Sequence, residues 1–217
     1  SKDIQAQKAV RIVEKSEYDQ ALSQYNLNIT DEEVKAAVTK IIAEKVSEND
    51  NLEVKKFLLG SVELTTLSTT DTEEKVLEMV EKVNRFDSEY PDLPHVAALC
   101  AYPCFTKLMA DSLEVDGVDI TNVTGNFPSS QTFLEVKTIE TALAIKDGAT
   151  HIDIVMPVGK FLSGDYEGVC DTINELKQVC GDVPMKVILE TGDLGNARAI
   201  KTASLLSMYA EIGRAHV

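Results

Sequence analysis

The sequence predicts an α/β protein built on a parallel sheet, and three observations favour a (β/α)8 barrel. From residue 61 onward, short apolar runs alternate with segments of helical periodicity, a pattern typical of βαβ units. The first strand-to-helix turn, STTDTEEK, contains no glycine, and neither GxGxxG nor GxxxxGK[ST] occurs anywhere. This disfavours the competing architecture, an open doubly wound sheet that binds nucleotides. Polar residues also recur near the ends of several strands, where a barrel builds its active site.

Residues 1–60 predict an N-terminal helical extension without a chemical motif. Thr30 and Glu33 have the spacing of a capping box, which marks a helix start. An apolar residue then recurs at helical spacing until the polar run at 49–51, which predicts an amphipathic helix. The apolar positions of this helix are Val34, Val38, Ile41 and Ile42.

Residues 61–210 predict the barrel itself. About five of the eight strands are visible, whereas a complete barrel takes roughly 250 residues. The expected strands are SVELTTL (61–67), VAALCAY (96–102), VDITNV (118–123), HIDIVMP (151–157) and KVILE (186–190). The expected helices span about 72–86, 105–113, 131–146, 166–179 and 194–209.

The net charge of −15 argues against nucleic acids and anionic membranes as partners, because both repel an acidic surface. It leaves room for an anionic small substrate, which backbone N–H groups can hold. No apolar run approaches the roughly 20 residues of a membrane span. The polar start SKDIQAQKAV is neither a signal nor a transit peptide, so we expect a cytoplasmic protein.

The four cysteines form neither a CxxC pair nor a disulfide-dense pattern, which predicts reduced thiols. The three histidines are scattered, so no metal site is expected. Cys170 and Cys180 fall on an expected helix or at its end, where a structural role is expected.

Asp153 lies within the apolar run HIDIVMP. An ionised carboxylate in a strand interior costs several kcal/mol unless it is paired or hydrogen-bonded. Two interpretations remain open at this point: a structural aspartate with a partner, or a catalytic one.

Alternation along the strands predicts which side chains share the barrel lumen with Asp153. Glu63 and Thr65 share a face of the first strand, Cys100 lies on the second, and Lys186 and Glu190 lie on the fifth. Such a set can do acid–base work, and a lumen lysine with a lowered pKa could form a Schiff base. Alternatively, the lysine and Glu190 only pair with other charges, and Cys100 is a small buried apolar side chain.

The motifs ELTTL, AALCAYP, VTGNFPSSQT, HIDIVMPVGKFLSGDYEG and MKVILETG occur in this order between residue 61 and about residue 210. Together they resemble the deoxyribose-phosphate aldolases, the DeoC-type class I aldolases. The extension at 1–60 also resembles that of the longer members of this family.

The resemblance implies a (β/α)8 barrel that reversibly cleaves 2-deoxy-D-ribose 5-phosphate to acetaldehyde and D-glyceraldehyde 3-phosphate, with no metal or organic cofactor. In this family one lysine forms a Schiff base with the substrate, a second lysine lowers the pKa of the first, and an aspartate with a bound water moves protons. By resemblance that aspartate is Asp153, and Thr65, Cys100 and Lys186 lie near the substrate. Lys186 then supports the site rather than forming the imine. Glu63 stands where relatives often have aspartate, and the full-length enzyme is compatible with a homo-oligomer.

The Schiff-base lysine of the family belongs to a sixth strand, after a helix that ends like SLLSMYA (204–210). The second lysine belongs to a seventh strand, and glycine- and serine-bearing loops hold the phosphate. Here SLLSMYA is followed by EIGRAHV (211–217), which back-translates to a common short-read sequencing adapter. We therefore expect a C-terminally truncated fragment with a non-native tail at 211–217, and no aldolase activity of the 217-residue chain.

Two further functions remain as alternatives. The chain could derive from another Schiff-base barrel aldolase that acts on a different phosphosugar. It could also be a non-catalytic barrel protein that needs a partner chain to complete the barrel.

Overall fold

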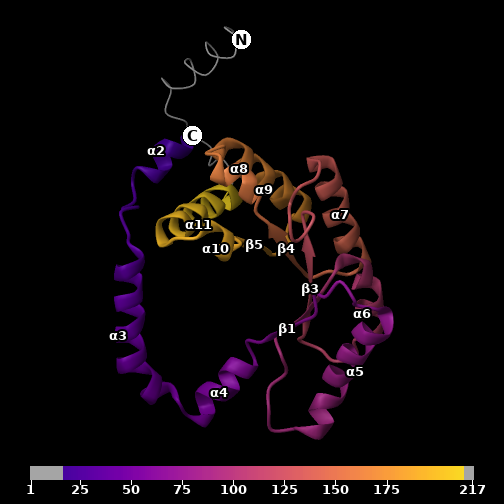
Figure 1. The fold of residues 1–217 in the computed structure, drawn as a ribbon. Helices are drawn as coiled ribbons and strands as arrows, with labels where there is room; N and C mark the ends of the chain where they lie inside the picture. Colours follow the sequence, from indigo (N-terminus) through magenta and orange to yellow (C-terminus); the bar gives the residue numbers. More distant parts are fainter. Residues whose placement is uncertain (1–16, 213–217) are drawn as a thin grey trace.

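A computed structural model describes residues 17–212, and at its centre lies a five-stranded parallel sheet whose strands are neighbours in sequence order (Figure 1). The order β1-β2-β3-β4-β5 never reverses, whereas a doubly wound sheet reverses its order at a switch point. The prediction of a barrel-type sheet is therefore confirmed. The strands are β1 (Glu63–Thr65), β2 (Ala98–Ala101), β3 (Asp119–Thr124), β4 (His151–Val155) and β5 (Met185–Ile188).

Helices follow each strand and cover one side of the curved sheet (Figure 1). Before the sheet come α2 (Glu17–Leu22), α3 (Asp31–Asn49) and α4 (Leu52–Leu59). Between the strands lie α5 (Glu73–Glu89), η1 (Pro103–Phe105), α6 (Thr106–Ser112), α7 (Leu134–Asp147), α8 (Val158–Leu162) and α9 (Tyr166–Cys180). After β5 come α10 (Thr191–Leu194) and α11 (Ala197–Ile212). The short helix α4 falls within the helical extension predicted for residues 1–60, whereas the short helices α8 and α10 were not expected from the sequence.

Alternate strand residues separate a helix side from an inner face, as the sequence predicts. On β4, Ile152 and Ile154 are fully buried in the core formed with α9 and α11. A second core under α5 and α6 contains Leu99 of β2 and Ile120 of β3. Because a one-residue slip would turn these apolar side chains away from the helices, the hydrophobic pattern fixes the register and holds Asp153 on the inner face.

The covering helices begin and pack as their sequences predict. The side chain of Thr72 caps α5 by accepting a hydrogen bond from the Lys75 N–H. Three valines at helical spacing, Val76, Val80 and Val83, are buried against the sheet. Burial of this apolar face stabilises the helix more than its intrinsic propensity does.

Helix α3 starts and ends where predicted, but it buries none of its residues. The Thr30–Glu33 capping box is present, and the Ala197 N–H of α11 donates to Asp31 Oδ1 over 2.7 Å at its start. The apolar stripe is nevertheless exposed, with Ile41 58% accessible. An amphipathic pattern thus produced a helix here without producing a packed face.

The first described helix of the N-terminal extension, α2, packs onto the barrel. Tyr18 and Leu22 of α2 are buried in the same core as β4, and the Tyr18 ring meets Tyr209 of α11 edge-on at 5.6 Å. Residues 1–16 of the predicted extension and 213–217 of the predicted tail lie outside the described residues. Within the described part, no helix combines the length and the apolar character needed to cross a membrane.

Candidate active site

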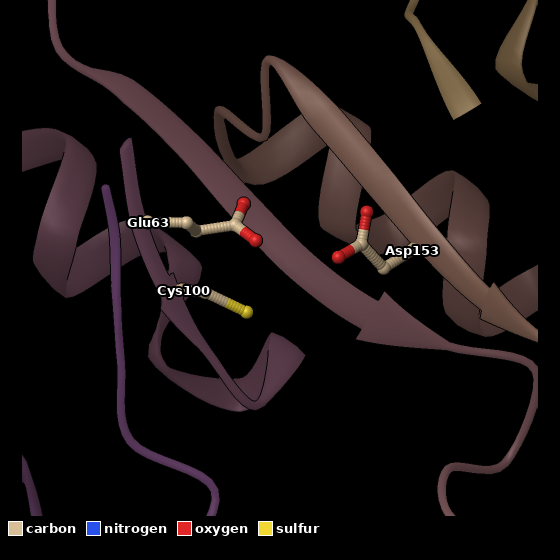
Figure 2. Close-up of side chains that lie close together, drawn as sticks. All are labelled: Glu63, Cys100 and Asp153. Carbon is tan, nitrogen blue, oxygen red and sulfur yellow. The ribbon is translucent and has the colours of Figure 1, made fainter. Parts of the chain in front are cut away.

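Four side chains from four strands meet on the inner face, and we call them the inner-face cluster: Glu63, Cys100, Asp153 and Lys186. The Lys186 ammonium lies 3.1 Å from Glu63 Oε2 and 3.2 Å from Asp153 Oδ2. Glu63 and Cys100 point toward Asp153 across the sheet (Figure 2). The register places Asp153 directly beside Lys186 and Thr65 directly beside Cys100, so Thr65 also borders the cluster. The structure therefore brings together all four site residues that the sequence predicts, which are Thr65, Cys100, Asp153 and Lys186.

Burial is uneven across the cluster. Cys100 and Asp153 are 2% and 7% exposed, whereas more than half of the Lys186 side chain, 56%, is accessible. The Oδ1 atom of Asp153 is buried and has no hydrogen-bond partner among the described residues. One oxygen of this carboxylate is thus held by the lysine, and the other is left for a further partner.

The lysine of the cluster is a stable cation. Burial lowers the pKa of Lys186, but the charges of Asp153 and Glu63 and their hydrogen bonds outweigh burial and leave that pKa above its ordinary value. Lys186 is therefore protonated at neutral pH and is a poor nucleophile. This agrees with a supporting role rather than an imine-forming one.

The pKa values of Asp153 and Cys100 are also raised, and in both cases burial is the main cause. Burial raises the pKa of Asp153, and Lys186 offsets only part of this effect. Burial also raises the pKa of the Cys100 thiol to about 12, with the charges of Glu63 and Asp153 acting in the same direction. A neutral thiol is a poor nucleophile, whereas a carboxyl whose pKa moves toward neutrality is suited to proton transfer.

Replacing Lys186 with Met is expected to lower the free energy of unfolding by about 1 kcal/mol at pH 7, because two facing carboxylates lose their shared cation. The loss should disappear at pH 3, where the carboxyls are protonated. Since the pKa of Lys186 is raised on folding, its contribution is also lost as the pH rises through that raised value. Urea denaturation at pH 3, 7 and 11 measures this. Lys186→Arg serves as the control that keeps the charge, and equal losses in both variants would contradict the prediction.

Two polar residues with a clear structural role, Asn122 and Asp71, were not predicted from the sequence. Asn122 of β3 is fully buried on the helix side, where its Nδ2 donates to the Ala101 carbonyl and its Oδ1 accepts from Thr106 Oγ1 over 2.7 Å. Asp71, after β1, accepts from Thr66 Oγ1, the Ser68 N–H and Lys75 Nζ. Although burial raises the pKa of Asp71, these bonds outweigh it and lower the pKa. Both residues fix loops at the carboxyl ends of strands.

The loop after β3 is tied to β4 by a buried lysine. Lys137 of α7 is 4% exposed, and its Nζ donates to Ser130 Oγ over 2.7 Å, while that hydroxyl donates to the Val155 carbonyl. Ser130 has a left-handed backbone with φ 60°, a conformation that is unfavourable for a residue other than glycine. The hydrogen bonds of its hydroxyl stabilise this conformation of the loop. Burial and repulsion from Lys160 lower the pKa of Lys137. Its sequence position on an expected helix gave no signal of burial.

Other predicted residues lie away from the cluster. Glu190 comes two residues after β5, in the left-handed conformation that precedes α10, and its carbonyl accepts the Asp193 and Leu194 N–H groups. Cys170 and Cys180 are buried on α9, in agreement with a structural role. All four cysteines are free thiols.

The parallel sheet and the cluster are typical of α/β barrel enzymes, in which polar side chains near the carboxyl ends of the strands form the active site. The sequence profile of the DeoC/LacD family aldolases matches residues 57–213. The chain belongs to this family.

Individual relatives agree with this assignment. A deoxyribose-phosphate aldolase of Homo sapiens is 32% identical over 164 residues, which cover 69% of this chain and 50% of that protein. A deoxyribose-phosphate aldolase of Mus musculus is 33% identical over 164 residues with the same coverage. The chain thus spans about half the length of these curated relatives.

Solved structures show the same fold. A structure from Coccidioides immitis matches with a TM-score of 0.64 at 23% identity, over 85% of this chain and 70% of that one. A tetrameric deoxyribose phosphate aldolase from Aeropyrum pernix matches with a TM-score of 0.52 at 26% identity, over 72% of this chain and 64% of that one.

Proposed function

We propose that this sequence provides the proton-transfer part of a deoxyribose-phosphate aldolase site, in a protein that cleaves 2-deoxy-D-ribose 5-phosphate through a lysine imine. The observation that supports the proposal is the different environment of the two carboxylate oxygens of Asp153. Its Oδ2 is held by Lys186, while its buried Oδ1 has no partner among the described residues. An oriented carboxyl with a raised pKa can accept and return a proton at the carbon next to an imine.

The supporting residues have distinct parts in this proposal. Lys186 fixes the orientation of Asp153 and offsets the charges of the two acids. Glu63 holds the second side of Lys186, so that the ammonium stays between both carboxylates. Thr65 and Cys100 line the neighbouring strands, where they border the substrate. A phosphosugar substrate, a homo-oligomeric full-length enzyme and a cytoplasmic location belong to the same proposal, supported by the names of the relatives and by the tetramer of Aeropyrum pernix.

The imine itself requires a neutral amine. Of the strand residues that the structure describes, Lys186 is the one lysine on the inner face, and it is held as an ammonium ion. We therefore propose that the 217-residue chain does not turn over substrate by itself.

Incubating the chain with deoxyribose 5-phosphate and sodium borohydride at pH 7 is expected to leave Lys186 unmodified, because its protonated amine cannot attack a carbonyl. Peptide mass spectrometry detects a reduced adduct as a fixed mass increase. The Lys186-containing peptide of an untreated sample is the control. An adduct on Lys186 would overturn the supporting role assigned to this lysine.

A chimera tests the activity. Residues 1–210 are continued with the segment of the Homo sapiens relative that follows the region of similarity. We expect the chimera to cleave deoxyribose 5-phosphate, measured by release of acetaldehyde. A folded chimera that cleaves other sugar phosphates but not this one would instead support another Schiff-base barrel aldolase.

A further inference from the structure

The inner-face cluster also has the composition of a metal site. Glu63 from β1, Cys100 from β2 and Asp153 from β4 each offer one ligand atom, and these three atoms lie within 4.8 Å of one another. In Figure 2 the three side chains converge from separate strands on a common region of the inner face. Ligands held by three strands of one sheet are positioned by the fold rather than by a flexible loop.

A second observation points to a ligand at this place. Asp153 is only 7% exposed, and its Oδ1 atom is buried without a hydrogen-bond partner among residues 17–212. Buried carboxylate oxygens normally have such a partner. A metal ion is one partner that satisfies a buried carboxylate oxygen without needing a hydrogen-bond donor.

The cation now at the site can leave. Lys186 bridges Glu63 and Asp153, but its side chain is 56% accessible, so its ammonium can turn into solvent when another cation takes its place between the carboxylates. Two facing carboxylates then require another positive charge. A divalent ion supplies more charge than the ammonium and binds both acids at shorter distances.

The donor set selects the kind of ion. One sulfur and two carboxylate oxygens suit Zn²⁺, whereas Mg²⁺ and Ca²⁺ prefer oxygen ligands alone. Tetrahedral Zn²⁺ bonds of about 2.0–2.3 Å place ligand atoms about 3.5 Å apart, a separation that small side-chain rotations can reach from atoms within 4.8 Å of one another.

We propose that Glu63, Cys100 and Asp153 bind Zn²⁺ in place of the Lys186 ammonium, and that the bound ion inhibits the enzyme by occupying Asp153. In this step a Zn–S bond forms, the Cys100 S–H bond breaks, and the thiol proton passes to bulk water. The inhibition rests on the proposed function, whereas the binding does not.

Cobalt(II) titration of the 217-residue chain tests the binding, because thiolate-bound Co²⁺ absorbs in the near ultraviolet and added Zn²⁺ should remove the band. We expect Cys100→Ser to abolish the band and Glu63→Gln to weaken Co²⁺ binding about tenfold. Cys104→Ser is the matched control, since Cys104 is an exposed thiol outside the cluster and its loss should leave the band unchanged. A band that survives Cys100→Ser and disappears in Cys104→Ser would overturn the site.

The Co²⁺ affinity of Lys186→Met distinguishes binding at the inner-face cluster from binding to the Cys100 thiol alone. Because the ammonium competes with the ion, its removal should tighten Co²⁺ binding about tenfold. Unchanged affinity would overturn the displacement of Lys186.

In the chimera, Zn²⁺ should inhibit cleavage at the concentrations that fill the site. A chimera that is folded by circular dichroism but inactive would refute the proposed function and leave the metal site standing. An active chimera that binds Zn²⁺ without inhibition would refute the inhibition.

Discussion

Asp153→Asn is expected to lower the kcat of the active chimera by about 10²–10⁴-fold, the usual contribution of a positioned acid–base group. The amide keeps the shape of the side chain but cannot take up a proton. KM should change little, because the variant removes proton transfer rather than a binding contact. Initial rates of acetaldehyde release over a range of substrate concentrations measure both constants.

Asp119→Asn is the matched control for this result. Asp119 also lies on the sheet, where it begins β3 and contacts Thr150 Oγ1 and His151, but among the described residues it makes no hydrogen bond or ion pair with the inner-face cluster. Its kcat should stay within about twofold of the parent, since exposed polar changes away from a site have small effects. A comparable loss in both variants would indicate a general structural effect and contradict the role of Asp153.

Asn122→Ala is expected to lower the free energy of unfolding by about 2–4 kcal/mol. The change removes the bonds to the Ala101 carbonyl and to Thr106 Oγ1 and leaves a cavity beside two partners that are themselves buried. Urea denaturation followed by circular dichroism at pH 7 gives the value.

Asn174→Ala is the control for Asn122. Its Nδ2 donates to the Ala210 carbonyl over 3.3 Å, but the side chain is only half-buried, so solvent can replace the bond. We expect a loss below about 1 kcal/mol. Equal losses of unfolding free energy in the two variants would show that burial of Asn122 does not strengthen its hydrogen bonds to Ala101 and Thr106.

Local pattern was sufficient to predict the strands and the inner face. Period-two alternation placed Asp153 opposite Ile152 and Ile154, and topology then brought Glu63, Cys100 and Lys186 onto the same face as Asp153. Of the two interpretations of Lys186, pairing with other charges of the inner face is the one observed, and its partners are Glu63 and Asp153.

The remaining features depend on contacts between distant segments. Asn122 is satisfied only because the chain after β2 returns over it, and Lys137 is buried only because the loop at Ser130 closes onto Val155. Neither contact leaves a periodic trace in the sequence. The exposed stripe of α3 illustrates the reverse case, in which the periodicity is present but the packing partner is not specified by it.

Helix α3 therefore depends on short-range interactions alone over most of its length. Its capping box and exposed ion pairs such as Lys45–Glu48 hold the helix, and no residue in it shares in the cooperative core. Such a segment opens without global unfolding. Its amide protons should exchange with deuterium long before those of β3 and β4, and a protease added to the native protein should cut there first.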